Sequence, residues 1–301
     1  MHSGLHLTAT VPLPPGLPGM FDHADVDGST GRVFVAHTAF GTVEVIDGVT
    51  LETVGRIREC PEASGVVCAA AARLVFAAAR AGGKVLVIDP DRMEVIREVM
   101  VGPRPNGLAW DGSRGHLLVA DVDPKDQSVR IVSRSKEVIA RTPLPGRPRW
   151  CAYEPEHDRY LVNIEDPAAV IVLSGDTAEK VATWNVAAKG PHGLELDPGG
   201  RRYFVACDGG EVVAIEPTGE EAGRTPISGA PDAIWFNPAR HRLYVAIGTP
   251  GVIDVIDTTN LEVVQTITTE VGAHTSAFDA LRQRLYVFLP NQCAAAVYEE
   301  L

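Results

Sequence analysis

Short runs of apolar residues recur along this chain, and each run follows a basic residue or a histidine. Seven such runs occur. They are VFVA after Arg32, LVFA after Arg73, LLVA after His116, YLVN after Arg159, YFVA after Arg202, LYVA after Arg242 and LYVF after Arg284. This recurrence of β-branched and aromatic residues predicts a repeat architecture built from strands.

Each repeat contains four segments with the composition of β-strands. A short alternating segment comes first and the apolar run second, and a V-x-V-I-D segment follows in several repeats, as at Val43–Asp47 and Val85–Asp89. A polar–apolar alternation such as Leu261–Thr269 comes fourth. Equivalent positions of successive repeats lie 40 to 43 residues apart. Four short antiparallel strands at this period predict an all-β fold, a seven-bladed β-propeller that occupies residues 1–301 as one domain.

The two ends of the chain predict how the ring closes. The last repeat supplies three strand segments, of which the third is AAAVYE, beginning at Ala294. At the other end, the stretch from Leu5 to Val11 has the alternation of a fourth strand. We expect this N-terminal strand to complete blade 7 beside its third strand, because closure leaves no exposed sheet edge in the ring.

The repeats resemble those of a known family, the YVTN-repeat (YncE-like) seven-bladed propellers. The resemblance is carried by the runs Leu243–Ala246 and Leu285–Phe288 and by the V-x-V-I-D segments that end at Asp47, Asp89 and Asp257. It covers essentially the whole chain and implies the propeller fold. Family members serve as binding modules, secreted proteins or surface proteins, so the resemblance leaves function open. The YVTN phrase itself is replaced here by FVAH, YVAI or YVFL.

One position of the repeat varies in a way that predicts a site. In propellers generally the first strand lines the central channel, and its start opens on one face. The seven residues expected there are Asp22, Ala63, Asn106, Arg149, His192, Asp232 and His274. Four residues further on, an apolar set is expected to pack between blades: Val26, Val67, Trp110, Tyr153, Leu196, Phe236 and Phe278. The seven residues expected at the start of the first strand do not share one residue type. This variation favours a role in ligand binding or catalysis over a purely structural role.

Two kinds of ligand suit these side chains. Imidazole and carboxylate together are ligands for Zn, Mn, Fe or Cu. The candidate divalent metal ligands, with His37 the weakest of them, are His192, Asp232, His274, Asp22 and His37. An arginine across the ring suits a carboxylate or phosphate of a small anionic molecule. The candidate residues for binding that molecule are Arg149, Asn106, Trp150 and His23.

Two classes of function therefore remain open. The first is a ligand-binding propeller that holds a small anionic molecule and a metal. His192 and His274 are then candidate catalytic residues of a metal-assisted hydrolase or lyase. The second class is a non-catalytic scaffold that presents a protein-binding face. For each histidine, a hydrogen-bonded structural role competes with the functional one.

Composition excludes some other classes. The formal net charge of −12 argues against binding to a nucleic-acid backbone, and no apolar run reaches membrane-spanning length. The N-terminus lacks a basic start followed by an apolar core, so we expect no secretory signal and a cytoplasmic protein. The five scattered cysteines are expected to be free thiols. The sequence Ser133-Arg-Ser-Lys136 matches Ser-x-x-Lys, but it falls in a blade-edge turn without supporting motifs, and chance explains it better.

Overall fold

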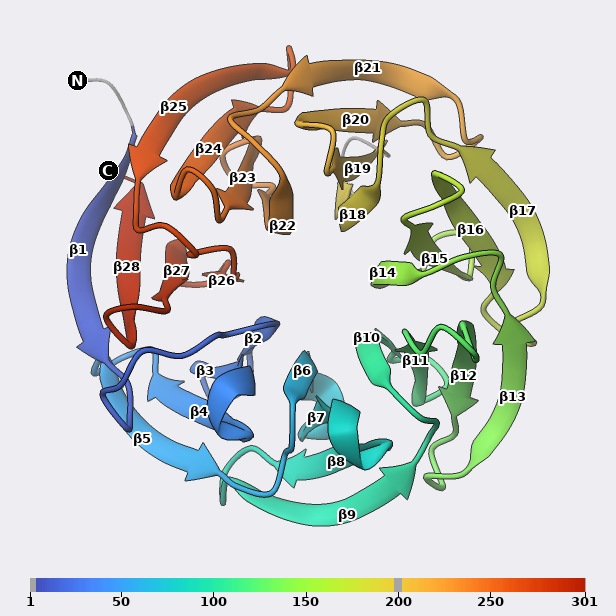
Figure 1. The fold of residues 1–301 in the computed structure, drawn as a ribbon, viewed down its shortest axis with the longest axis horizontal. Coiled ribbons are helices and arrows are strands. Elements are labelled where there is room, and N and C mark those ends of the chain that lie inside the picture. The colour runs from blue at the N-terminus through green and yellow to red at the C-terminus, as the bar shows by residue number, and fades with distance from the viewer. Residues whose placement is uncertain (1–3, 198–201, 301) are drawn as a thin grey trace.

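The strands of this protein form a ring of seven sheets around a central channel (Figure 1). The computed structural model describes residues 4–197 and 202–300. Each sheet has four antiparallel strands, and the innermost strands β2, β6, β10, β14, β18, β22 and β26 surround the channel. The prediction of an all-β, seven-bladed propeller is confirmed.

The blades follow one another in chain order, apart from the first strand. Blade 1 contains β2 (Ala24–Asp27), β3 (Arg32–His37), β4 (Thr42–Asp47) and β5 (Glu52–Ile57). Blade 2 contains β6 (Ala63–Ala69), β7 (Leu74–Ala79), β8 (Lys84–Asp89) and β9 (Glu94–Met100). Blade 3 contains β10 (Pro105–Asp111), β11 (His116–Asp121), β12 (Ser128–Val132) and β13 (Val138–Pro143). Blade 4 contains β14 (Pro148–Glu154), β15 (Arg159–Ile164), β16 (Ala169–Ser174) and β17 (Lys180–Asn185).

The remaining blades complete the ring. Blade 5 contains β18 (Pro191–Asp197), β19 (Arg202–Cys207), β20 (Glu211–Ile215) and β21 (Glu221–Pro226). Blade 6 contains β22 (Pro231–Asn237), β23 (Arg242–Ile247), β24 (Val252–Asp257) and β25 (Glu262–Thr268). Blade 7 contains β26 (Ser276–Asp279), β27 (Arg284–Leu289), β28 (Ala294–Glu300) and β1 (Leu5–Pro12). Three short 3-10 helices occur in turns: η1 (Thr38–Phe40), η2 (Ala70–Ala72) and η3 (Arg80–Gly82). Within the described ranges, no helix has the length and apolar character needed to span a membrane.

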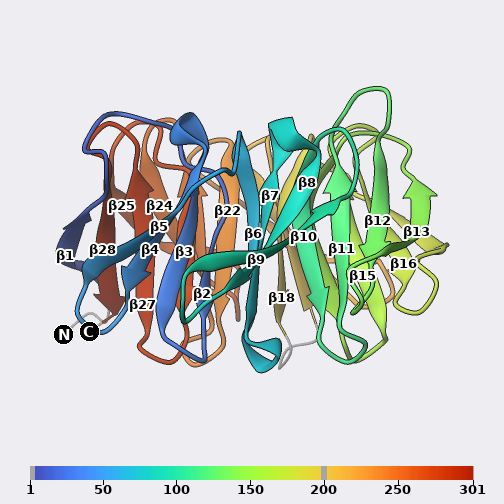
Figure 2. The same ribbon diagram turned by 90° about the horizontal axis from the view of Figure 1, so that it is seen from below.

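The N-terminal strand closes the ring as the sequence predicted. β1 pairs antiparallel with β28, with Leu5 opposite Glu300 and Val11 opposite Ala295. The start of β1 and the end of β28 therefore lie together at the outer edge of blade 7 (Figure 1) and on the lower face of the disc (Figure 2). Leu5 and Val11 are buried, so the closing strand contributes apolar side chains as well as backbone hydrogen bonds.

The hydrophobic core lies between neighbouring blades. Each of seven buried clusters draws side chains from two adjacent blades, as where Phe34 of β3 packs with Val75 of β7. The second and third strands of a blade are apolar on both faces because both faces meet another blade. The outermost strands instead alternate exposed and half-buried residues, as β13 does. This explains why the apolar runs are continuous in the sequence and the fourth segments alternate.

The register predicted for blade 2 is wrong by one residue. Ala63 pairs with Ala79 as Pro105 pairs with Asp121 in blade 3, so Ser64 occupies the place expected for Ala63. By the same shift, Cys68 replaces Val67 in the apolar set. The cause is the turn between β6 and β7, where η2 ends at Arg73 with a left-handed φ of 53° and β7 begins one residue later.

The apolar set is only partly the interblade core that was expected. Phe236 and Phe278 are buried, but Trp110 and Tyr153 are half-buried. These two rings lie near the C-terminal ends of β10 and β14. The Tyr153 hydroxyl donates to Asp158 Oδ1 over 2.8 Å in the following turn. The large aromatic residues thus reach beyond the blade interface at this face.

Candidate ligand site at the channel mouth

The variable residues of the repeat converge on one cavity at the channel mouth. The cavity has a volume of about 170 Å³. Six residues of the predicted ring line it: Asp22, Asn106, Arg149, His192, Asp232 and His274. The blade 2 residue Ser64 does not take part, because it is fully buried and its hydroxyl donates to Pro105 O over 3.2 Å. The geometric part of the expectation, convergence at one mouth, is thus found in the structure.

His23 and Trp150 form the floor of the cavity. They follow the mouth residues of blades 1 and 4, and their rings stack with centroids 4.3 Å apart. The corresponding residues of the other blades are small: Gly65, Gly107, Gly193, Ala233 and Thr275. At Gly193 a Cβ atom would approach the Asp232 carbonyl oxygen to 2.6 Å, so close contact between inner strands requires glycine there. The small residues leave the channel centre to the two rings.

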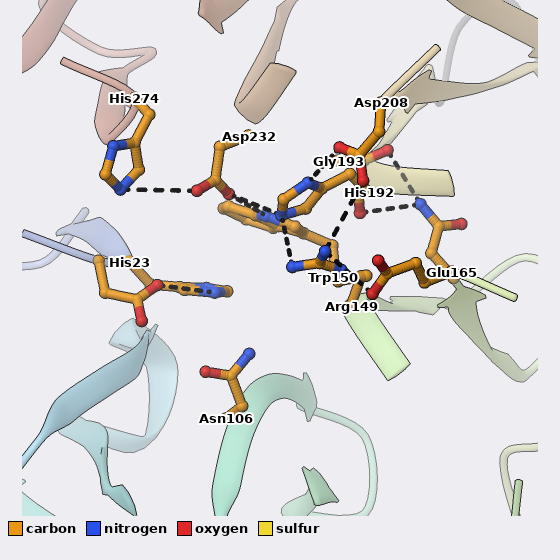
Figure 3. A network of polar contacts seen from close by, with 12 residues as sticks. His23, Asn106, Arg149, Trp150, Glu165, His192, Gly193, Asp208, Asp232 and His274 are labelled. Carbon is orange, nitrogen blue, oxygen red and sulfur yellow. Dashed lines mark hydrogen bonds and ion pairs between the residues drawn. The ribbon is translucent and has the colours of Figure 1, made fainter. Parts of the chain in front are cut away.

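His192 is held between two carboxylates. Its Nδ1 lies 2.9 Å from Asp208 Oδ1, and its Nε2 lies 3.2 Å from Asp232 Oδ1 (Figure 3). Burial alone would lower the pKa of His192, but the charge of Asp232 and hydrogen bonds to both carboxylates raise that pKa to about 9. The imidazole therefore carries two protons at neutral pH and donates from both nitrogens. Asn163 fixes the backbone beneath it, since its Nδ2 donates to the carbonyl oxygens of His192 and Gly193 over 3.0 Å each.

Asp232 lies at the centre of the contacts. Trp150 Nε1 donates to its Oδ1 over 3.2 Å, and His274 Nε2 lies 3.7 Å from its Oδ2 (Figure 3). Burial works against its charge, but the neighbouring histidines, led by His192, lower the pKa of Asp232 well below its usual range. His274 Nδ1 lies 2.7 Å from the Gly272 carbonyl oxygen, which only accepts hydrogen bonds, so Nδ1 carries a proton.

Arginines cover the opposite side of the cavity. Arg149 Nη2 lies 3.0 Å from Glu165 Oε2, and Arg80 Nη2 donates to Asp22 Oδ2 over 2.7 Å and also to Asn106 Oδ1. The Nε atoms of Arg80 and Arg149 are buried and have no acceptor among the described residues. Arg147 also lines the cavity. The cavity lining is therefore rich in cationic donors, within a protein of formal net charge −12.

The balance of charge in the lining is positive. Three arginines and the protonated His192 face two carboxylates, Asp22 and Asp232, which gives four positive against two negative groups. Glu165 and Asp208 pair with Arg149 from outside the lining, at 3.0 and 3.7 Å. These two carboxylates orient the guanidinium and leave its other donors to the cavity.

The proposed metal ligands do not form a compact ligand set. His192, Asp232 and His274 do not bring one donor atom each to within 4.8 Å of one another. His37 lies outside the cavity: it is fully buried, its Nδ1 is 3.4 Å from Glu44 Oε1, and its ring stacks on Phe21. A metal ligand must also offer a free imidazole nitrogen, whereas both ring nitrogens of His192 contact carboxylates. Metal binding at the mouth stays a prediction.

A second set of residues, in the cavity lining or just outside it, was not predicted from the sequence. Arg80, Glu165 and Asp208 each follow the second strand of their blade. Each lies sixteen positions after the mouth residue of that blade, as Asp208 follows His192. The full set at this offset is Thr38, Arg80, Val122, Glu165, Asp208, Gly248 and Pro290. These residues share no residue type, and in blade 2 the offset reaches Arg80 only when it is counted from Ser64, which the strand pairing identifies.

Below the stacked rings lies a second chamber of the channel, of about 320 Å³. His23 and Trp150 line both spaces and so separate them. Asp25 and Glu195 are partly exposed to the lower chamber. Burial raises the pKa of Asp25 to about 6 and that of Glu195 to about 8. The lower chamber thus holds carboxyl groups that favour protonation, in contrast to the cationic mouth.

Comparison with known proteins supports the fold alone. No protein-family model matches this chain, and no curated protein matches it. Among solved structures, it is similar to Kuenenia stuttgartiensis hydrazine synthase, with a TM-score of 0.82 and 15% sequence identity. The match covers 93% of this chain and 95% of that one. At this level of identity the shared feature is the propeller itself, and site chemistry must be argued from this chain's residues.

Proposed function

We propose that this protein binds a small anionic molecule, a carboxylate or a phosphate, in the channel mouth. The observation that carries the proposal is the group of basic side chains lining the cavity, in which two carboxylates hold His192 beside Arg149. His192 Nε2 lies 3.5 Å from Arg149 Nη1. Asp208, Asp232 and Glu165 already contact these two groups, and an anion in the cavity would accept hydrogen bonds from the donors that they leave free.

The size of the cavity limits the ligand. A volume of about 170 Å³ is several times the share of one water molecule in the liquid, about 30 Å³. It is smaller than the cavities of about 300–1,000 Å³ that hold drug-sized ligands. The mouth therefore suits a compact acid or phosphate ester, with Arg149 and Arg80 as charged partners and Asn106 as a neutral one. Trp150 and His23 supply a flat floor.

An enzymatic role, as a hydrolase or lyase, is a second candidate that one observation favours. His192 and His274 lie on either side of Asp232, with their Nε2 atoms 3.2 and 3.7 Å from its carboxylate oxygens. His274 Nδ1 donates to the Gly272 carbonyl oxygen, so its Nε2 is the atom that faces Asp232. Such a pair can supply one proton and accept another during a reaction. We also propose membership of the YVTN-repeat family, which the blade strands support.

The proposal is tested by calorimetric titration of untagged, chelator-free protein with a panel of short carboxylic acids and phosphate esters. We expect at least one compound to bind, and Arg149→Gln to weaken that binding by about tenfold or more. Arg141→Gln is the matched control, because Arg141 is an exposed arginine on the outer strand β13. Absence of binding across the panel, or equal loss in the two variants, would overturn the proposal.

A further arm addresses the metal. Adding Zn²⁺ or Mn²⁺ to the same protein should leave its melting temperature unchanged at neutral pH if His192 is held as a cation. A rise in melting temperature that disappears in the His192→Ala, His274→Ala double variant would instead support the metal site predicted from the sequence.

A further inference from the structure

A second concave surface lies on the face opposite the mouth, between blades 2 and 3. This groove, of about 410 Å³, is lined by Leu74, Trp110, Ser113, Arg134 and Lys136 among others. Trp110 comes near the end of the inner strand β10, and Ser113 follows in the turn to β11. The mouth cavity is instead at the start of the inner strands. The two surfaces are therefore separate.

Two cations line this groove, and a third lies near them. Lys136 lies in the turn between β12 and β13, and its Nζ is 4.9 Å from the ring centroid of Phe76 and 5.9 Å from that of Trp110. Arg134 belongs to the same turn, and Arg97 comes from β9 of blade 2. Burial, followed by the charges of Arg97 and Arg134, lowers the pKa of Lys136. The positive charges of Arg97 and Arg134 thus lie close enough to Lys136 to disfavour its protonated form.

No carboxylate compensates these charges. Within residues 4–197 and 202–300, neither Lys136, Arg97 nor Arg134 has an ion pair with an acidic side chain. Arg114 in the neighbouring turn, by contrast, pairs with Asp111 at 3.0 Å. The adjacent Glu137 accepts a hydrogen bond from Ser135 instead. An uncompensated group of three cations is unexpected in a chain of formal net charge −12, and an anion from outside would stabilise it.

The groove also holds Lys136 in place. The residue has a left-handed φ of 67°, and the two aromatic rings, themselves stacked 5.2 Å apart, lie beneath its ammonium group. The Trp110 indole N–H has no acceptor among the described residues and is not buried. Gly115 is at φ 70°, and a Cβ there would lie 3.4 Å from the Arg134 side chain. A fixed ammonium, a guanidinium and a free N–H donor therefore border one space.

We propose that this groove is a second ligand site and that it binds a phosphate-bearing small molecule. A phosphate monoester carries about −1.5 to −2 charges at neutral pH, and a diphosphate carries more, whereas a carboxylate carries one. The cluster of three cations matches the phosphate better. Lysine and arginine are both phosphate-binding residues. This site is independent of the anion site at the channel mouth, since no residue lines both.

The Ser-x-x-Lys sequence at Ser133–Lys136 lies in this same turn. Ser133 Oγ lies 2.7 Å from Ser135 Oγ, while Lys136 reaches over Trp110. The lysine is therefore directed to the groove, and the motif forms part of a binding turn between two outer strands.

The test uses inorganic pyrophosphate as the probe in calorimetric titration of the full chain at low ionic strength. Lys136→Gln and Arg134→Gln should each weaken binding by about tenfold, because each removes one positive charge of the protein that attracts the ligand. Lys180→Gln, at an exposed lysine on β17, should leave this affinity unchanged. The same titration of Arg149→Gln identifies any pyrophosphate that binds at the mouth. Binding should also change indole fluorescence, and Trp110→Phe should abolish that change.

Three outcomes would overturn the proposal. The first is that pyrophosphate does not bind. The second is that Lys180→Gln weakens binding as much as Lys136→Gln does, which would indicate non-specific attraction. The third is that only Arg149→Gln removes binding, which would place the probe at the mouth. If the mouth does not bind an anion, Lys136→Gln, Arg134→Gln and Lys180→Gln still test the groove. The two proposals can therefore fail separately.

Discussion

The Nε2 atom of His192 lies 3.2 Å from Oδ1 of Asp232, and this contact joins blade 5 to blade 6 at the channel mouth. The two residues are equivalent in their repeats, so the pair is a contact between two copies of the same position. Asp208 holds the other ring nitrogen and fixes the orientation of the imidazole. The site is thus built by the meeting of neighbouring repeats whose shared position carries opposite charges.

The His192 contact predicts how ligand binding depends on pH. The folded-state pKa of about 9 lies above the ordinary value of 6.5. The stabilisation from the charged form is therefore complete below about pH 6.5 and is lost as pH rises through 9. Affinity for an anion at the mouth should follow the same loss above pH 8. Titrations between pH 6 and pH 10 measure it.

Two variants provide the controls for this pH step. His192→Gln should remove the step, and His157→Gln, at an exposed histidine on the opposite face, should keep it. A step at pH 9 that survives in His192→Gln would show that another group controls binding.

Glu195 predicts a pH dependence of stability with the same sign as that of His192. Its folded-state pKa of about 8 exceeds the ordinary 4.5, so the folded protein binds more protons than the unfolded chain between these values. Stability from this group is present at low pH and falls as pH rises toward 8. Glu195→Gln should therefore raise the melting temperature at pH 8.5 more than at pH 5. Glu220→Gln, an exposed residue, should give no such difference, and equal behaviour of the two variants would contradict the assignment.

The burial of the apolar set predicts graded costs of truncation. Phe278→Ala should lower the free energy of unfolding by about 3–5 kcal/mol, as expected when a large aromatic residue leaves a core. Trp110→Ala should cost less, because the ring is half-buried and borders the groove. Chemical denaturation measures both. An equal cost would mean that both rings are packed to the same extent.

The closing strand predicts that the N-terminus is required for stability. Deletion of residues 1–13 exposes the backbone of β28 and removes the buried Leu5 and Val11. We expect a large fall in melting temperature and a tendency of the truncated chains to associate. Replacement of the exposed Leu7 by Ser is the control, since it should change stability little. A truncated chain that melts like the intact one would contradict the role of β1.

The fold could be predicted from the sequence because its unit is local and repeated. Each blade is specified by its own alternation and turns, and seven copies average out a single ambiguous segment. The Ala-rich blade 2 shows the limit. Its turn η2 shifts the strand by one residue, and the aligned Arg73 therefore misplaced Ala63. Backbone conformation in a turn decides such shifts, and Arg73 itself gives no signal of its positive φ.

The candidate site was predicted in part, for a related reason. Equivalent positions in a closed ring must meet at the mouth, so the convergence of Asp232 and His274 followed from spacing alone. Protonation could not be predicted, because it depends on side chains from another strand. Asp208 lies beside His192 only after β18 and β19 pair, and together with Asp232 it raises the pKa of His192.

The pairing of β1 with β28 also sets the order of events during synthesis. The segment Leu5–Pro12 is made before the other strands of the ring, and its only β-sheet partner among the described strands is the segment Ala294–Glu300. The ribosome must therefore complete nearly all seven blades before the first strand can pair. Until then β1 is an unpaired strand that any suitable edge could capture, including that of a neighbouring nascent chain. Ring closure makes the protein's assembly depend on delayed recognition between its two ends.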